Sequence, residues 1–221
     1  MELSDVMRTT GAVRSFTDEP VTDATLRAVL DDARFAPSGG NRQGWRVAVV
    51  RDAALRRRLA EACAPVWNEY VAQSAAGETP FSVTAASSID LVEAQRTPAP
   101  NPLLDELEGA PVWLVVAVDM GALAVMDRDL ARPSIVGGAS IYPFCQNILL
   151  AARAHGLGGV MSTFVVRVEP ELAEPLGLPE GHALAAMIVL GHPVHQPTQL
   201  RRNAVEDFTT VDRFDGPVFE G

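Results

Sequence analysis

The sequence contains no lysine, and all 18 of its basic residues are arginine. The absence of lysine excludes P-loop nucleotidases, Schiff-base enzymes and pyridoxal-phosphate enzymes of the usual kind, because each depends on a lysine amine. The 28 acidic residues outnumber the arginines and give a formal net charge of -10. A chain this acidic is a poor partner for a phosphate backbone, so we expect no nucleic-acid binding.

Cysteine and histidine are also scarce. The two cysteines, Cys63 and Cys145, lie in apolar helical patterns, and the four histidines are scattered. No cluster has metal-ligand spacing, so no metal site is predicted. Isolated thiols in apolar surroundings are typical of buried, reduced cysteines, as in the cytoplasm.

Long hydrophobic runs are missing as well. No apolar stretch reaches the length of a membrane span, and Glu2 and Asp5 stand where a signal peptide would carry basic residues. Hydrophobic residues nevertheless make up 48% of the chain, which is enough for a sizeable core. We therefore expect a single soluble, cytoplasmic domain over residues 1–221, without membrane contact.

The spacing of apolar residues predicts helices and buried strands in alternation. Helical spacing or capping signals occur over residues 3–10, 22–33, 52–63, 139–155 and 170–176. Continuous apolar runs predict buried strands over residues 45–50, 111–119 and 183–190, and residues 158–166 form a glycine-led strand or loop. The helix over 139–155 is apolar nearly all round, so we expect it to be wholly buried.

Two segments lack this regularity. Residues 73–110 are rich in Gly, Ser, Thr and Pro, and we interpret them as a mobile lid over a site, with a disordered surface loop as the alternative. Residues 192–221 form a polar C-terminal arm. Its large apolar residues should pack on another surface; they are Val205, Phe208, Val211, Phe214 and Phe219.

The stretch between the second helix and the first strand is the densest in chemically useful residues. Residues 36–45 read Ala-Pro-Ser-Gly-Gly-Asn-Arg-Gln-Gly-Trp. The glycines allow close approach of the backbone, and N–H groups exposed in such a bend favour an anionic or carbonyl-bearing partner. Asn41 and Gln43 each carry an amide that donates and accepts, which suits a planar ligand. A tight surface loop rich in turn formers is the simpler alternative.

Familiar catalytic motifs are absent from the chain. There is no catalytic triad, no paired-carboxylate spacing and no HExxH. The glycines at 156, 158 and 159 follow a helix and open none, so they are not a dinucleotide fingerprint. If the chain is an enzyme, a cofactor therefore carries out the chemistry.

The segment Pro37-Ser38-x-x-Asn41-x-Gln43-x-Trp45 resembles the flavin-binding loop of the nitroreductase family of FMN-dependent NAD(P)H oxidoreductases. Three further places resemble the same family, and with the loop they extend over residues 5–206. These places are Arg8 with Arg14-x-Phe16, the glycines 156–159 after the apolar helix, and Gly191-x-Pro193 followed by Arg201 and Arg202. Common members carry adjacent arginines shortly before Phe16, where this chain has Thr10 and Gly11.

The resemblance implies a set of FMN-binding residues. They are Arg8, Arg14, Ser15, Pro37, Ser38, Gly39, Gly40, Asn41, Gln43, Ser162, Thr163 and Arg201. Arg14 is expected at the N1/O2 edge of the ring, where the reduced flavin carries negative charge. The backbone N–H groups of Ser162 and Thr163 are expected near N5, and Arg8 and Arg201 near the phosphate. For Arg14 the alternative is a salt bridge to Asp18 or Glu19, and for Arg201 the alternative is a solvated residue of the arm.

The resemblance also implies an α+β, nitroreductase-like fold. Its central mixed β-sheet would be surrounded by helices, and its C-terminal arm would be exchanged between the subunits of a homodimer. NADPH or NADH would reduce the flavin, and N5 would pass two electrons to a small-molecule acceptor (a nitroaromatic, a quinone or an activated alkene) in a ping-pong sequence. The flavin carries the chemistry, so no catalytic residue is assigned. Tyr142 either shapes the acceptor pocket with the 73–110 region or is a core residue with a satisfied hydroxyl.

Two other functions remain open. One is a specialised flavin enzyme of the same fold, which fragments its own flavin with oxygen or removes halogen reductively from an aromatic ring. The dehalogenating branch relies on a lid that includes lysine, which this chain lacks. The other is a flavin-binding or storage protein without turnover, in which the lid region blocks entry of the acceptor.

Overall fold

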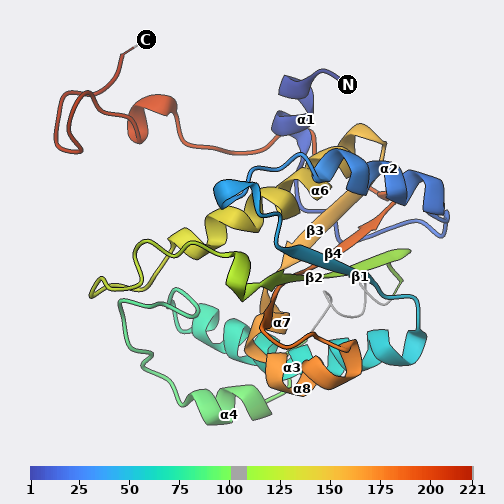
Figure 1. Cartoon of the computed structure of the whole chain (residues 1–221). Helices are drawn as coiled ribbons and strands as arrows, with labels where there is room; N and C mark the ends of the chain where they lie inside the picture. The colour runs from blue at the N-terminus through green and yellow to red at the C-terminus, as the bar shows by residue number, and fades with distance from the viewer. Residues whose placement is uncertain (101–108, 221) are drawn as a thin grey trace.

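The central sheet consists of apolar strands, and its two inner strands are buried on both faces between layers of helices (Figure 1). The computed structural model describes residues 1–100 and 109–220. Its strands are β1 (Trp45–Val49), β2 (Val112–Asp119), β3 (Gly158–Ser162) and β4 (His182–Gly191), in the spatial order β1-β2-β4-β3. The predicted strands are thus confirmed, and residues 158–162 are the strand rather than the loop.

The sheet is antiparallel, whereas a mixed sheet was expected. All three pairings run antiparallel: β2 runs opposite to both β1 and β4, and β3 runs opposite to β4. Among the described residues, parallel pairing occurs only at an isolated bridge between Ala12 and Gly159. The α+β class itself is confirmed.

Alternate residues of β2 enter two separate cores, because successive side chains of a strand point to opposite faces. Leu114 and Val116 pack beneath α2 (Asp23–Ala33) and α6 (Tyr142–Ala154). Trp113 and Val115 pack against the helices of the other face. Those helices are α3 (Ala53–Ala75), α7 (Phe164–Arg167) and α8 (Glu169–Leu176), with α4 (Leu91–Arg96) outside them (Figure 1).

Local signals correctly predicted where several helices begin. Thr22 caps α2 by accepting from the Thr25 N–H, and Asp52 caps α3 by accepting from the Leu55 N–H. However, α3 continues well past residue 63, through Pro65, to Ala75. Packing of its apolar face into the second core outweighs the hydrogen bond that proline removes, which local spacing could not reveal.

The N-terminal helix and the long apolar helix both lie above the sheet in Figure 1. The first is α1 (Leu3–Thr9), and the second, α6, begins at Tyr142 because residues 136–140 form a 3₁₀ turn. The expectation that the second is wholly buried is wrong, because Phe144 and Ile148 lie in the core whereas Tyr142 is exposed. None of the described helices is both long enough and apolar enough to cross a membrane.

Gly159 allows close contact between β3 and β4. A Cβ atom at Gly159 would lie 2.5 Å from the Val189 carbonyl oxygen. Gly159→Ala should therefore lower the free energy of unfolding by about 1–3 kcal/mol, as overpacking does. Urea denaturation measures this. The control is Gly137→Ala, whose added methyl would meet its nearest neighbour at 3.5 Å; equal stability of the two variants would contradict the prediction.

Candidate functional site

The loop before β1 has an unusual backbone. Gly40, Asn41 and Gln43 all have positive φ, at 60°, 53° and 50°. Ser38 Oγ fixes this bend by accepting from the Gln43 N–H at 2.9 Å. A positive φ is unfavourable for residues other than glycine. It persists where surrounding contacts enforce it, as at binding sites.

Polar groups remain available on this loop. Gln43 Nε2 donates to Asn41 Oδ1 at 3.1 Å, which orients the two exposed amides together. Within the described part of the chain, Asn41 Nδ2 and Gln43 Oε1 make no hydrogen bond. One donor and one acceptor thus remain side by side, and this pair fits the edge of a planar ligand with alternating donors and acceptors.

The start of α6 lies beside the same loop. The Gly39 N–H donates to Ser140 Oγ at 3.1 Å, two residues before Tyr142. Tyr142 is 39% exposed and its hydroxyl lies 3.4 Å from the Ala185 carbonyl oxygen. Partial burial raises the pKa of this hydroxyl. Tyr142 thus has the hydrogen bond expected of a core residue and the exposed ring expected of a pocket residue.

A second group of predicted residues lies along β3. The Val13 N–H donates to the Gly159 carbonyl, and the Ser15 carbonyl accepts from the Val194 N–H. This brings exposed Arg14 and Ser15 next to β3, at whose end Ser162 and Thr163 lie. Because β3 is an edge strand, it presents backbone N–H groups outward.

Arg14 does not form the salt bridge considered as its alternative. Glu19 approaches His192 instead, at 3.6 Å, and no carboxylate among the described residues pairs with Arg14. An exposed guanidinium without an acidic partner is notable in a chain of net charge -10. It remains available to compensate a negative charge on a ligand.

Arg8 of the predicted set comes close to Arg202, whereas its neighbour Arg201 does not line the same hollow. Gln196 Nε2 donates to the Thr9 carbonyl at 2.9 Å, which joins the end of α1 to the beginning of the arm. A hollow of about 1130 Å³ lies between them, lined in part by Arg8 and Arg202. No described carboxylate pairs with Arg8, Arg201 or Arg202. Arg202 was not in the predicted set, although its position next to Arg201 was a usable signal.

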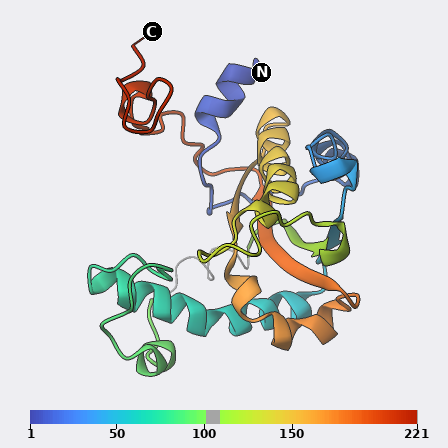
Figure 2. The same cartoon turned by 60° about the vertical axis from the view of Figure 1, so that its left-hand side comes forward.

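The predicted residues do not form one site within a single chain. We define residues 37–43 as the loop half-site, and Arg8, Arg14, Ser15, Ser162, Thr163 and Arg201 as the arginine half-site. The loop precedes β1 and the arginine half-site flanks β3, which are opposite edges of the sheet (Figures 1 and 2). Three strand spacings separate these edges, about 14 Å. Local spacing could not reveal this separation, because it does not determine the order of the strands.

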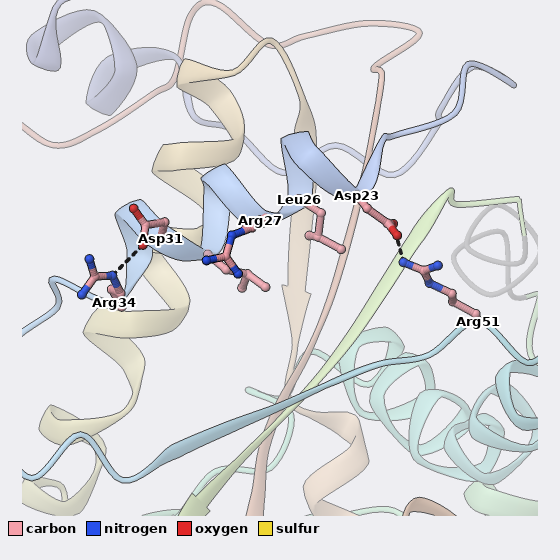
Figure 3. A pocket seen from close by; sticks show the side chains of 7 residues that line it. Asp23, Leu26, Arg27, Asp31, Arg34 and Arg51 are labelled. Carbon is pink, nitrogen blue, oxygen red and sulfur yellow. Dashed lines mark hydrogen bonds and ion pairs between the residues drawn. The ribbon is translucent and has the colours of Figure 1, made fainter.

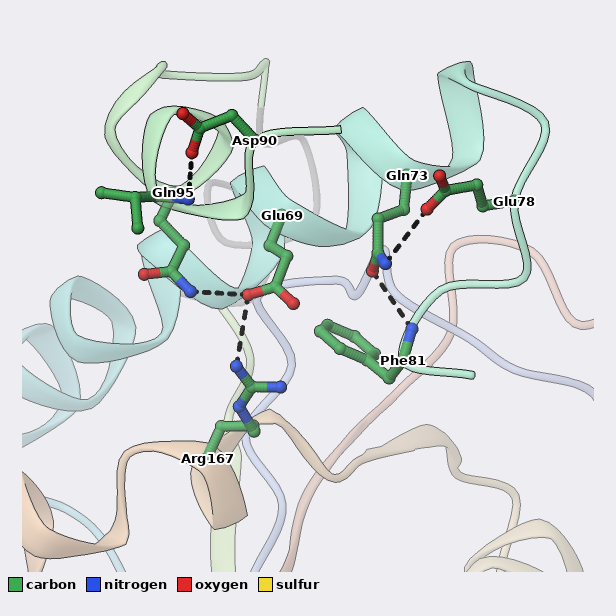
Figure 4. Close-up of polar contacts among 8 residues, drawn as sticks. Glu69, Gln73, Glu78, Phe81, Asp90, Gln95 and Arg167 are labelled. Carbon is green, nitrogen blue, oxygen red and sulfur yellow. Dashed lines mark hydrogen bonds and ion pairs between the residues drawn. The ribbon is translucent and has the colours of Figure 1, made fainter. Parts of the chain in front are cut away.

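The described part of the predicted lid is anchored to α3. Residues 73–75 belong to that helix, and Gln73 Nε2 donates to Glu78 Oε2 at 3.3 Å (Figure 4). Glu78 also accepts from Ser87 Oγ and Ser88 Oγ, both at 2.6 Å. The Asn68 side chain bonds to the backbone of Gln95 and Ala99. Residues 101–108 of the predicted lid lie outside the described residues.

A separate hollow of about 750 Å³ lies beside α2 (Figure 3). Its arginines are largely neutralised, because Arg34 pairs with Asp31 and Arg51 pairs with Asp23. It contains none of the predicted site residues and is a weaker candidate for an anionic ligand.

The chain is similar to known proteins over most of its length. The family model described as the nitroreductase family matches residues 7–192. A Thermus thermophilus protein named NADH dehydrogenase is 30% identical over 84% of this chain and 83% of its own length. Nitrobenzene nitroreductase from Ectopseudomonas oleovorans is 27% identical over 94% of this chain and 96% of its own.

Solved structures show the same fold. The crystal structure of a nitroreductase with bound FMN from Desulfitobacterium hafniense superposes with a TM-score of 0.65. It is 25% identical, and the match covers 96% of this chain and all of that one. The expected nitroreductase-like fold is therefore confirmed.

The hydrogen bonds of Glu78 should make the lid segment sensitive to acid. By lid segment we mean residues 76–100, the part of the predicted lid that follows α3 and that the structure describes. Hydrogen bonds from Ser87 and Ser88 lower the pKa of Glu78 from 4.5 to about 2. Because this folded-state pKa is depressed, the stabilisation is complete above pH 4.5 and is lost as the pH falls toward 2. Glu78→Gln should thus have a lower Tm than the parent chain at pH 7, with the gap closing between pH 4.5 and 2.

Thermal unfolding of both proteins across that pH range measures the effect. Glu61→Gln, which removes an exposed carboxylate from the neighbouring helix α3, is the control and should follow the parent at every pH. A gap between Glu78→Gln and the parent that is constant from pH 7 to 2 would contradict the assignment.

Proposed function

The chain belongs to the nitroreductase family, and from this premise we propose that it is an FMN-dependent oxidoreductase. It transfers two electrons from NAD(P)H to a small electrophilic acceptor such as a nitroaromatic, a quinone or an activated alkene. The names of its relatives, NADH dehydrogenase and nitrobenzene nitroreductase, support both halves of this reaction. The observation that carries the proposal is the pair of half-sites at opposite edges of the sheet.

The residues present fit FMN. Its ring is planar with alternating donors and acceptors, which matches the available amide groups of Asn41 and Gln43. Its phosphate is a dianion, which matches guanidinium groups that lack carboxylate partners at Arg8, Arg201 and Arg202. The bound FMN of the relative from Desulfitobacterium hafniense supports the same choice.

We further propose a homodimer in which the loop half-site of one copy meets the arginine half-site of the other. A single chain keeps these half-sites about 14 Å apart, so a second copy is the simplest way to complete each site. The arm supports this, because it extends away from the body and leaves Phe208 and Phe214 exposed (Figures 1 and 2). Exposed aromatic residues on an arm favour burial against another chain.

Each half-site then has a distinct role. When bound, FMN supplies the redox chemistry, by accepting hydride from NAD(P)H and passing two electrons to the acceptor. Arg14 compensates the negative charge that develops at the N1/O2 edge. Ser162 and Thr163 direct backbone N–H groups toward N5, and Arg8 with Arg201 holds the phosphate. No side chain is required as a proton donor, since water can supply the proton.

Two further features complete the proposal. Tyr142 and the lid segment shape the acceptor pocket, supported by the exposed ring of Tyr142 beside the loop half-site. A reducing, cytoplasmic location is supported by Cys63 and Cys145, which are buried and unbridged.

Arg14→Met and Arg201→Met should separate the ring contact from the phosphate contact. Arg14→Met should slow reduction of the flavin by NAD(P)H by about 10²–10³-fold, as loss of one preorganised contact does, and lower its potential. Arg201→Met should instead weaken FMN binding and leave the potential of the bound fraction near that of the parent. Stopped-flow reduction, redox titration and an FMN dissociation constant for each variant measure this. A parental potential in flavin-loaded Arg14→Met would refute the ring contact.

Removal of residues 204–221 should dissociate the dimer. In the described structure the hydrogen bonds of this segment are internal, so the body of each copy keeps its own fold. The shortened chain should sediment as a monomer and retain little FMN, while the full chain sediments as a yellow dimer. A shortened chain that binds FMN as tightly as the full one would contradict the shared site.

A further inference from the structure

A buried carboxylate lies beneath the β3 edge, outside both half-sites. Glu69 on α3 is only 2% exposed. Its Oε2 accepts from Gln95 Nε2 at 2.7 Å and from Arg167 Nη2 at 3.3 Å (Figure 4). A buried charge is costly unless it is paired, so its neighbours indicate what it holds in place. Gln95 belongs to α4 and Arg167 belongs to α7.

Helix α7, whose last residue is Arg167, needs such support. α7 is four residues long, too short to persist by hydrogen bonding alone. Its first residue, Phe164, follows directly after Ser162 and Thr163, and its last is Arg167. The position of the Ser162–Thr163 turn therefore depends on what fixes the two ends of α7.

Aromatic packing holds the first end. The Phe164 ring centroid lies 6.2 Å from that of Trp67, 5.9 Å from Tyr70 and 6.5 Å from Phe81. These rings come from α3 and the lid segment, so they hold Phe164 against the same helix that carries Glu69.

Glu69 and Phe81 hold the second end. The Arg167 guanidinium lies 5.3 Å from the centroid of the Phe81 ring while it pairs with Glu69. Phe81 itself has a φ of 57°, and its N–H donates to Gln73 Oε1 at 3.1 Å; Gln73 is 4% exposed (Figure 4). A strained backbone persists only where contacts enforce it, so Arg167 is held between two groups that are themselves fixed.

We propose that Glu69 is a positioning residue for the cofactor: through Arg167 it fixes α7, and thereby the Ser162–Thr163 turn that faces flavin N5. This rests on the proposed function. Loss of the pair leaves the fold and the phosphate contacts in place, but it lets the turn move away from N5. Oxidised flavin then loses more stabilisation than reduced flavin, because N5 of the oxidised ring accepts hydrogen bonds from these N–H groups, whereas reduction places a hydrogen on N5.

Two variants test the pair, with a matched control. Glu69→Gln removes the charge with little change of shape, and Arg167→Met removes the partner. The control is Glu174→Gln: Glu174 is an exposed carboxylate on α8 whose oxygen lies 3.9 Å from Arg58 of α3, and it does not contact α7. All three variants thus lose one charge from a pair that includes α3.

The first measurement is amide hydrogen exchange of the FMN-free protein. In Glu69→Gln and in Arg167→Met, exchange of residues 162–168 should rise at least tenfold, while residues 182–191 of β4 keep the parental rate. Glu174→Gln should match the parent in both segments. This readout needs no flavin and no turnover.

The second measurement is a redox titration of the FMN-loaded variants. Both should bind oxidised flavin about tenfold less favourably relative to reduced flavin, a rise of about 30 mV for a two-electron couple. The dissociation constant of oxidised FMN should rise about tenfold, while that of reduced FMN should stay within threefold of the parent. The double variant should show no larger shift than either single one, because both remove one interaction.

The outcomes distinguish this proposal from the proposed function. A parent chain that binds no FMN overturns both. A parent that binds FMN, with variants of unchanged exchange and potential, overturns only the role of Glu69. If the single variants unfold, Glu69→Met/Arg167→Met leaves no unpaired buried charge and must show the same local exchange and the same potential. Parental values in that protein also overturn the proposal.

Discussion

The structure depends on a sheet whose two inner strands are buried on both faces. β2 and β4 send alternate side chains into two helical layers, so their side chains are nearly all buried. Polar residues that are to meet a ligand must therefore lie at the edges and ends of strands. The loop half-site precedes β1 and the arginine half-site flanks β3, which are the two edges. The same burial that stabilises the chain thus divides its candidate site and favours a second copy to complete it.

Unpaired arginines and residues with positive φ occur at both edges. The chain has many more acidic than basic residues, yet Arg14 and Arg201, like Arg27 and Arg57 elsewhere, have no carboxylate partner among the residues that the structure describes. Non-glycine residues with positive φ occur at Asn41 and Gln43 in the loop half-site, at Phe81 beneath the other edge and at Asp212 in the arm. Both features lower the stability of an isolated chain and are expected where a ligand compensates them.

The lid segment is held by the same helix that carries Glu69. Its described part is bound to α3 by Glu78, Gln73 and Asn68. α3 also carries Glu69, whose carboxylate receives hydrogen bonds from both α4 and α7. One helix therefore supports both the described part of the predicted lid and the turn expected to face N5.

The sequence alone determined the local features: the caps at Thr22 and Asp52, the buried strands, and the loop residues from Pro37 to Gln43 with their family. These follow from interactions between residues close in the chain. Only the tertiary structure decided the strand order, the extension of α3 through Pro65, and the burial of Glu69 beside Arg167, which lies 98 residues away. A glutamate within a helical pattern normally indicates a solvated face. Its partner here comes from packing between distant segments, and no local pattern records that contact.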